Sequence, residues 1–231
     1  MKWELTELSP DKKAVSLKWI FKVKRDAKDV FEKYKVRIVV REFSQIAGLD
    51  FNETFAPVVR IESIRIILAL AAANDLYILH VDCKNAFLHG KSDVELYVSQ
   101  PEGFCDEEFP DKVLRLNKSL YGLKQAPRIW YLFLCGVIVG PGFVQLEMDS
   151  CIYIHDDIIV EVYVDDIKIV GLTMARCEAV YKELAQHINI ESPNLCESLN
   201  NNSCFIFFKD TFCISLDLKY PFEGDCFLTR R

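Results

Sequence analysis

The stretch VEVYVDDIKIVG, residues 160–171, sets two adjacent aspartates inside an apolar run with β-strand character. Apolar residues on both sides predict two strands, with Asp165 and Asp166 at or near the tight connection between them. Two carboxylates about 4 Å apart repel each other by roughly 4 kcal/mol at an effective dielectric constant near 20. A divalent cation removes this repulsion, and a small set of carboxylate oxygens favours Mg²⁺.

A third carboxylate stands at the end of another predicted strand, in ILHVDCKNAF, residues 78–87. Three aspartates from two strands, Asp82 with the first pair, can hold two metal ions that support phosphoryl transfer by positioning and charge neutralisation. The alternative interpretation of an Asp-Asp pair is a solvated turn, which we expect for Asp156–Asp157. The residues alone leave both interpretations open for the first pair.

Composition suits a globular protein: of 231 residues, 51% are hydrophobic and 27% are charged. The apolar run 131–144 is short and contains glycine and proline, so we expect no membrane span, and the first residues do not resemble a signal peptide. Nine cysteines without a CxxC pair favour reduced thiols in an intracellular protein. Cations outnumber acids over residues 1–49 although the net charge is −6, so a basic front end could hold phosphates.

Hydrophobic periodicity predicts a mixed order of strands and helices. A two-stranded basic ribbon is expected from Val15 to Phe43, with Lys22 and Lys24 on one face. Helices are expected over residues 61–74, 128–139 and 175–188, and strands over 76–82, 94–104, 112–123 and 151–171. This mixed order predicts an α+β fold. Beyond Glu191 no clear periodicity is left.

Several ordered motifs resemble the reverse transcriptase of copia-type long-terminal-repeat retrotransposons. They are ETFAPVVRIESIR (53–65), VDCKNAFLHG (81–90), YVSQPEGF (97–104), SLYGLKQAPRIWY (119–131) and YVDD (163–166). The resemblance runs from Trp3 to about His187. It implies a right-hand polymerase within residues 1–190, with fingers mainly at 14–60 and a palm mainly at 61–190. Residues 191–231 form a divergent tail in which the family's thumb is missing.

The resemblance also implies roles for individual residues. Asp82, Asp165 and Asp166 resemble the catalytic metal ligands, with the backbone carbonyl of Cys83 as an extra ligand for two Mg²⁺ ions, or Mn²⁺ in their place. Phe87 falls where related polymerases place an aromatic steric gate against the 2′-hydroxyl. The alternative for Phe87 is a core residue.

Further residues match family positions that contact nucleotide or nucleic acid. Lys24 and Arg37 resemble the finger residues that grip the triphosphate, with solvated strand charges as the alternative. Tyr121 and Gly122 match a nucleotide-binding segment, in which glycine permits close backbone approach. Nucleic-acid contacts are implied for Lys124, Arg128 and Tyr163. For the segment around Gly122 the alternative is a plain turn before a helix.

Departures from the family pattern lie in the finger turn and in the tail. Asp29 occupies a position that would tolerate a positive φ, with the β-branched Val30 after it, and Glu42 replaces a glycine beside Arg41. The family sequence generally continues without a proline where this chain has Pro141, and we expect Pro141 to end the preceding helix. Loss of the thumb would weaken binding to primer and template, because phosphate contacts supply much of the affinity.

The sequence therefore favours an RNA-directed DNA polymerase fragment of a Pol polyprotein. Its expected partners are a primed RNA or DNA template, deoxynucleoside triphosphates and other Pol domains such as ribonuclease H and integrase, in the cytoplasm, a virus-like particle or the nucleus. The alternative is a non-catalytic remnant that retains the fold and weak nucleic-acid binding. A metal-dependent phosphodiesterase is disfavoured because no histidine or glutamate near YVDD offers an evident base.

Overall fold

The structure is a computed structural model that divides into two compact units. Unit 1 comprises Met1–Ala56 and Asn85–Leu134, and unit 2 comprises Pro57–Lys84 and Cys135–Arg231. The structure describes residues 2–26, 28–92 and 94–195, and it describes the strands at 203–208, 212–217 and 228–229. The predicted division into fingers at 14–60 and palm at 61–190 stays a prediction.

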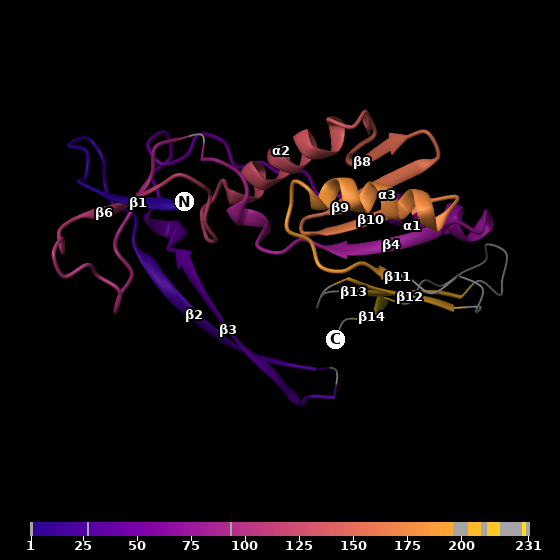
Figure 1. Cartoon of the computed structure of the whole chain (residues 1–231), viewed down its shortest axis with the longest axis horizontal. Coiled ribbons are helices and arrows are strands. Elements are labelled where there is room, and N and C mark those ends of the chain that lie inside the picture. Colours follow the sequence, from indigo (N-terminus) through magenta and orange to yellow (C-terminus); the bar gives the residue numbers. More distant parts are fainter. Residues whose placement is uncertain are drawn as a thin grey trace. The chain divides into compact units, whose positions relative to one another are not determined.

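Unit 1 contains an antiparallel sheet of three short strands in the order β1-β6-β5 (Figure 1). They are β1 (Trp3–Thr6), β5 (Tyr97–Val98) and β6 (Val113–Leu116). Two 3₁₀ turns, Glu42–Ser44 and Ala86–Leu88, also belong to this unit. Its core gathers buried aliphatic residues from distant segments, including Val15, Val40, Leu96, Leu114 and Leu123.

A two-stranded ribbon also belongs to unit 1 and confirms the predicted hairpin. β2 (Leu17–Arg25) pairs with β3 (Phe31–Val40), with Phe21 opposite Val36 and Lys22 opposite Lys35. Since paired residues share a face, one face is apolar and the other is rich in lysine. At the turn, Asp29 adopts a φ of 62°, the positive φ considered from the sequence.

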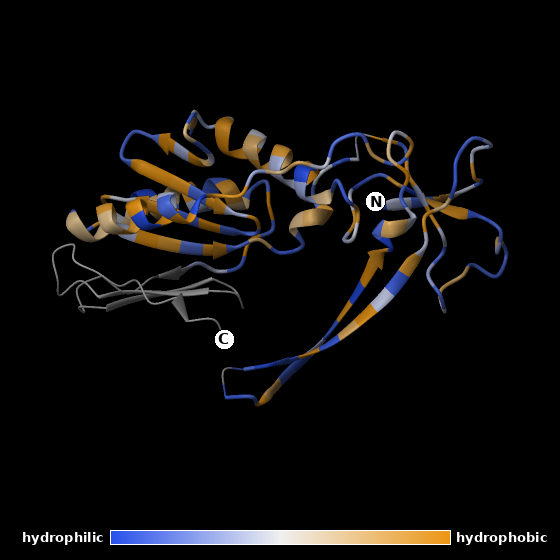
Figure 2. Ribbon diagram, turned by 180° about the vertical axis from the view of Figure 1, so that it is seen from behind, coloured by the Kyte–Doolittle hydropathy of each residue, from blue (hydrophilic) through white to orange (hydrophobic). Residues whose placement is uncertain are grey.

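Unit 2 is built on an antiparallel sheet in the order β11-β4-β10-β9-β8-β7. The strands are β4 (Tyr77–Asp82), β7 (Val144–Leu146), β8 (Asp149–His155), β9 (Ile158–Tyr163), β10 (Asp166–Gly171) and β11 (Asn194–Leu195). Figure 2 shows these strands largely in the apolar colour. Every residue of β10 is buried, so the acidic hairpin rises directly from the core of the unit.

Helices α1 (Ile61–Ala73) and α3 (Met174–Ala185) belong to unit 2 and confirm two sequence predictions. The buried face of α1 carries Ile64, Ile67, Leu68 and Ala71, and burial of each isoleucine or leucine side chain contributes about 1.5–3 kcal/mol. α3 begins at Thr173, whose side chain accepts a hydrogen bond from the Arg176 N–H. It packs on β4 and β10.

Helix α2 (Ala126–Val139) confirms the third predicted helix. It ends two residues before Pro141, as expected from a residue that cannot continue a helix. Among the helices that the structure describes, none is long and apolar enough to cross a bilayer.

Besides residues 191–195, which include β11, the described part of the tail contains strands β12 (Ser203–Phe208), β13 (Phe212–Asp217) and β14 (Leu228–Thr229), in a three-stranded sheet in the order β12-β13-β14. The sequence showed no clear periodicity over this stretch. Most of the predicted divergent segment 191–231 lies outside the described residues.

Five cysteines of the described residues are free thiols, namely Cys83, Cys105, Cys135, Cys151 and Cys177. Burial, followed by the nearby charges of Asp149 and Glu161, raises the pKa of Cys151 to about 12. Burial likewise raises the pKa of Cys177 to about 11. These two thiols therefore stay protonated at neutral pH and are poor nucleophiles.

Candidate active site

The paired aspartates lie at the tight connection between β9 and β10, as the sequence predicted. Tyr163 pairs with Asp166 at the end of the ladder, so Val164 and Asp165 form a two-residue loop. Asp166 is therefore the first residue of β10, and Asp165 stands in the turn. Tyr163, a predicted nucleic-acid contact, closes the hairpin and is partly exposed.

Backbone conformation in this loop is unusual for its residues. φ is positive at Val164, at 56°, but not at Asp165, which is the sign pattern of a type II′ turn. Glycine normally takes the first loop position, because a β-branched residue there costs of order 1–3 kcal/mol. Strain of this kind is concentrated at functional sites and is retained when the surrounding structure holds it.

The third aspartate lies on the neighbouring strand. Asp82 is the register partner of Asp166, so their side chains share one face of the sheet. The Cys83 N–H donates to the Asp165 carbonyl at 2.8 Å, and this hydrogen bond flanks the pair of Asp82 and Asp166. The two aspartates therefore form a non-hydrogen-bonded pair, in which the Cα atoms lie about 4.5 Å apart. The backbone thus brings the three predicted aspartates together.

The carbonyl of Cys83 points toward the same hairpin. In the peptide that joins Cys83 to Lys84, the Lys84 N–H donates to the Asn189 carbonyl at 2.7 Å. The N–H and C=O of a trans peptide point in opposite directions, so the Cys83 carbonyl is directed away from Asn189 and toward the Asp165 side. This orientation places the predicted extra oxygen ligand on the side of the aspartates.

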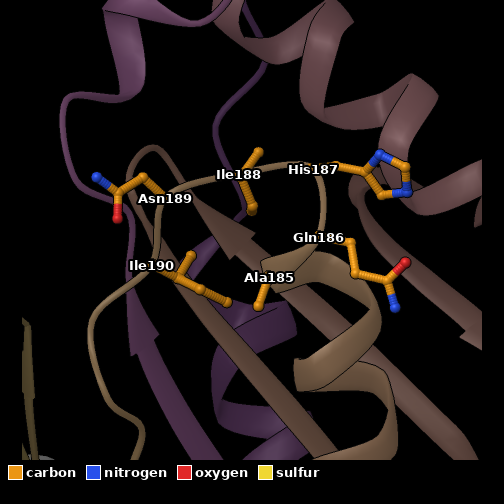
Figure 3. A pocket seen from close by; sticks show the side chains of 6 residues that line it. All are labelled: Ala185, Gln186, His187, Ile188, Asn189 and Ile190. Atoms are coloured by element: carbon orange, nitrogen blue, oxygen red, sulfur yellow. The ribbon is translucent and has the colours of Figure 1, made fainter.

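The segment after α3 holds this end of β4 in place. Besides the Asn189 contact, the Glu191 N–H donates to the Asp82 carbonyl at 2.9 Å. Residues 185–190 line a hollow of about 390 Å³, and Figure 3 shows their side chains around it. The position of Asp82 is therefore fixed by backbone pairing on both sides of its strand.

Two features of this sheet face were missed in the sequence. His80 Nε2 lies 3.2 Å from Asp166 Oδ1, although the sequence offered no histidine near YVDD. Strand pairing explains the discrepancy, because a residue 86 positions away can be a cross-strand neighbour. The period of two along ILHVD, which places His80 and Asp82 on one face, was the available signal.

The second missed feature is a buried ion pair. Lys168 Nζ lies 2.8 Å from Glu161 Oε1, and their side chains are 1% and 0% exposed. The two residues are register partners on β10 and β9. An ion pair at such depth is costly to desolvate, so it is no indication of stability in itself.

The aspartates fit a divalent metal ion in donor chemistry and in backbone position. Asp82 and Asp166 are register partners on one face of the sheet, and at about 5 Å two carboxylates repel by about 3 kcal/mol. In the described residues, no three side chains of His, Cys, Asp or Glu already surround one point. Binding of an ion would therefore require a rotation of these side chains.

Three predicted nucleotide-binding residues meet in unit 1. The rings of Phe87 and Tyr121 lie 5.3 Å apart with an edge-to-face geometry, and the Arg37 guanidinium lies 5.3 Å from the Tyr121 ring. Phe87 is half-buried against the hydrophobic core of the unit, so it also packs as the alternative interpretation anticipated. The steric-gate role of Phe87 stays a prediction.

Gly122 is required for a contact that the sequence did not suggest. Its φ is +84°, and a Cβ there would lie 2.3 Å from the Val40 carbonyl oxygen. The Val40 N–H also donates to the Tyr121 carbonyl at 2.8 Å. The close approach that the glycine permits in this structure is to β3.

The remaining basic candidates lie apart from one another in unit 1. Lys24 shares the basic face of the ribbon with Arg37, but it pairs with Lys33 while Arg37 pairs with Ile20. The two cations are thus four residues apart, about 13 Å along the strand. They do not form a single compact site.

Lys124 and Arg128 make contacts within unit 1. The Lys124 ammonium lies 4.9 Å from the Phe51 ring centre. Arg128 pairs with Glu53 at 3.0 Å and donates to the Phe55 carbonyl at 3.2 Å. Their roles as nucleic-acid contacts stay predictions.

A family model described as "Reverse transcriptase (RNA-dependent DNA polymerase)" matches residues 1–198. The chain is 44% identical over 174 residues to the Retrovirus-related Pol polyprotein from transposon TNT 1-94 of Nicotiana tabacum. That alignment covers 73% of this chain and 13% of the relative. With the polyprotein from transposon RE2 of Arabidopsis thaliana the identity is 38%, over 82% of this chain and 13% of the relative.

Two solved structures align with this chain in a structural comparison. A foamy viral protease-reverse transcriptase in complex with double-stranded DNA matches with a TM-score of 0.40 and 14% identity, over 85% of this chain and 31% of the other. A telomerase from Candida tropicalis matches with a TM-score of 0.47 and 10% identity, over 98% of this chain and 57% of the other.

Proposed function

The chain belongs to the reverse transcriptase family, among the copia-type Pol polyproteins, and we propose that it supplies the fingers and palm of an RNA-directed DNA polymerase. The observation that carries the proposal is the meeting of Asp82, Asp165 and Asp166 on adjacent strands at a strained hairpin. The proposed substrates are deoxynucleoside triphosphates and a primed RNA or DNA template.

The three aspartates are proposed to hold two Mg²⁺ ions, with Mn²⁺ as a substitute, and the Cys83 carbonyl is proposed as an additional ligand. When bound, these ions would activate the primer 3′-hydroxyl and neutralise the triphosphate charge. The buried strand β10 fixes Asp166 at its first residue, and the hairpin turn fixes Asp165 beside it. Rigid strand positions of this kind support preorganised catalytic groups.

The nucleotide is proposed to meet the cluster of Phe87, Tyr121 and Arg37. Arg37 is supported in this role because its guanidinium already lies against an aromatic ring, which restricts its rotamers. Phe87 is proposed to exclude a 2′-hydroxyl. Lys24 is proposed to contact phosphate from the basic face of the ribbon.

Template and primer are proposed to contact Lys124, Arg128 and Tyr163. Since the chain spans about 13% of the length of the TNT 1-94 and RE2 polyproteins, partnership with other Pol domains, including ribonuclease H and integrase, is part of this proposal. The proposed place of action is the cytoplasm or a virus-like particle, with the nucleus as the alternative.

A non-catalytic remnant with weak nucleic-acid binding is the second candidate. The observation in its favour is that the curated family match ends at residue 198, before most of the tail. A metal-dependent phosphodiesterase gains a candidate base in His80. However, its Nε2 is engaged with the Asp166 carboxylate rather than with a water position.

Primer extension tests the proposal directly. The 231-residue chain is incubated with a primed RNA template, deoxynucleotides and Mg²⁺, beside its Asp165→Asn and Asp156→Asn variants. We expect extension by the parent and by Asp156→Asn, and none by Asp165→Asn. Circular dichroism checks that all three proteins are folded.

Two results would contradict the polymerase. No extension by folded parent protein, with retained binding of primed template, would favour the remnant. Degradation of the nucleic acid instead of extension, lost in Asp165→Asn, would favour the phosphodiesterase.

A further inference from the structure

His80 contacts the proposed metal site without belonging to the proposed ligand set. Its Nε2 lies 3.2 Å from Asp166 Oδ1, and the side chains are 20% and 4% exposed, respectively. His80 stands two residues before Asp82 on β4, and Asp82 is the register partner of Asp166. The contact is therefore a cross-strand diagonal on the face that carries both aspartates.

The direction of this hydrogen bond follows from its chemistry. An ionised carboxylate has only acceptor atoms, so Nε2 of His80 must carry the proton and donate it to Oδ1. Nε2–H is one of the two tautomers of neutral imidazole, so the bond does not need a charged ring. One oxygen of Asp166 is thereby occupied, and Oδ2 is left to face an ion.

A neighbouring lysine on the same sheet face forms a buried ion pair. Lys168 is the register partner of His80, yet its Nζ bonds Glu161 on β9 at 2.8 Å. Glu161 Oε2 is also buried and accepts no hydrogen bond in the described part of the chain. In the described residues, the side chain of Asp166 is hydrogen-bonded to His80 Nε2.

We propose that His80 is a positioning residue that orients Asp166 for a divalent metal ion. The inference rests on the proposed function, since it assigns Asp166 as a ligand. Hydrogen bonds from such outer groups hold ligating carboxylates in orientation, and their loss typically lowers metal affinity about 10–100-fold. His80 itself touches neither the metal nor the substrate in this role.

Three variants of the full chain separate positioning from packing. His80→Leu removes the donor and keeps a side chain of similar size, whereas His80→Gln places an amide N–H at about the position of Nε2. His155→Leu is the matched control, because His155 also lies beside an aspartate, at 3.9 Å from Asp156, on the same sheet. Thermal unfolding followed by circular dichroism compares the stability of the four proteins.

Two readouts are measured for each protein. Electron paramagnetic resonance of free Mn²⁺ gives the dissociation constant, and primer extension gives the Mg²⁺ concentration for half-maximal rate and the KM for deoxynucleotide. We expect His80→Leu to weaken Mn²⁺ binding by about 10–100-fold and to raise the Mg²⁺ requirement in parallel. His80→Gln should restore most of the affinity, and His155→Leu should leave both readouts unchanged.

Several outcomes would overturn the proposal. Unchanged Mn²⁺ affinity in His80→Leu would do so, as would parent protein that binds no Mn²⁺. Equal losses in His80→Leu and His80→Gln, with lowered unfolding temperatures, would make the residue a packing group. If the Mn²⁺ affinity depends on His80 as expected but the parent extends no primer, the positioning role is retained and the polymerase is contradicted instead.

Discussion

Two consecutive hairpins of the same sheet carry adjacent aspartates, and they differ in what surrounds the charges. Both connect their strands through a two-residue loop, 156–157 after β8 and 164–165 after β9. Both have a positive φ at the first loop residue, 51° at Asp156 and 56° at Val164. Because successive turns of an antiparallel meander lie at opposite ends of the sheet, the two pairs are separated within one unit.

In the first hairpin the protein supplies the countercharge. Arg176 lies 3.3 Å from Asp156 and 2.6 Å from Asp157. Asp156 is exposed, as expected for the solvated turn that the sequence predicted there, whereas Asp157 is only 22% exposed. In the second hairpin a third carboxylate, Asp82, takes the opposing position. The comparison shows that the same local Asp-Asp motif can have different cross-strand neighbours, and the proposed metal site depends on those neighbours.

Neutralising one aspartate in each hairpin should give the largest difference in primer-extension rate between the two hairpins. Asp166→Asn should slow primer extension about a thousand-fold or more, because metal neutralisation of charge supplies several kcal/mol and each 1.4 kcal/mol or so is a factor of ten. Asp157→Asn should extend primers at nearly the parental rate. Single-turnover kinetics measure both, and similar losses in the two variants would break the comparison.

Another aspartate of this sheet, Asp149, sharpens the contrast, because it accepts hydrogen bonds from the backbone and from a serine hydroxyl. Asp149 Oδ2 accepts from the Arg60 N–H at 3.0 Å and from the Ser63 hydroxyl at 2.7 Å, which caps the start of α1. Asp149→Ala should lower the free energy of unfolding by about 1–3 kcal/mol, since buried donors lose their acceptor. Urea denaturation measures this loss, and a change below about 0.5 kcal/mol would contradict the capping role.

The stability contributed by Asp149 should depend on pH. Burial by itself raises its pKa, but hydrogen bonds from Arg60, Ser63 and Cys151 outweigh this and hold the pKa below the ordinary value of 3.8. A lowered pKa in the folded state means that the stabilisation is fully present above the unfolded pKa and disappears as pH falls through the folded pKa. The stability difference from Asp149→Asn should therefore be constant near neutrality and shrink below about pH 4.

The two hairpins differ in the backbone strain at the first loop residue, which is Val164 in one and Asp156 in the other. Val164→Gly should stabilise the fold by about 1 kcal/mol, because a β-branched residue with positive φ is strained. Asp156→Gly should change stability less, since aspartate tolerates this conformation. Thermal unfolding measures both, and an equal gain in the two variants would show that Val164 carries no special strain.

Removal of the countercharge should have the smallest effect. Arg176→Ala should cost about 1 kcal/mol, because Arg176 is 47% exposed and its pair with Asp156 is exposed, whereas Asp157 is partly buried, and it should leave primer extension unchanged. The loss should decrease at high salt. A strong dependence of extension on Arg176 would mean that the two turns are functionally coupled.

Local pattern was sufficient to predict the elements that carry the site. The apolar runs around YVDD and before Asp82 gave the strands, and the period of α1 gave its buried face, because these signals are set by residues close in sequence. The family resemblance, rather than spacing, joined the three aspartates. Neither the local pattern nor the resemblance indicated that Asp82 lies directly opposite Asp166, which the strand register shows.

Contacts between distant residues account for what the sequence did not reveal. The His80 bond to Asp166 and the buried pair of Lys168 with Glu161 depend on which strands are neighbours. The approach of Gly122 to Val40 depends on where a turn meets β3. Strand order and register are set by packing of the whole unit, so they cannot be deduced from one strand. Buried polar pairs are therefore the features for which a structure was needed.

Calorimetric titration with Mg²⁺ and Mn²⁺ tests most directly the claim that one acidic hairpin is a metal site and the other is not. The proteins are the parent, Asp165→Asn/Asp166→Asn and Asp156→Asn/Asp157→Asn. The account predicts binding by the parent and by the second double variant, and none by the first. Binding that survives in the first, or that disappears in the second, would contradict it.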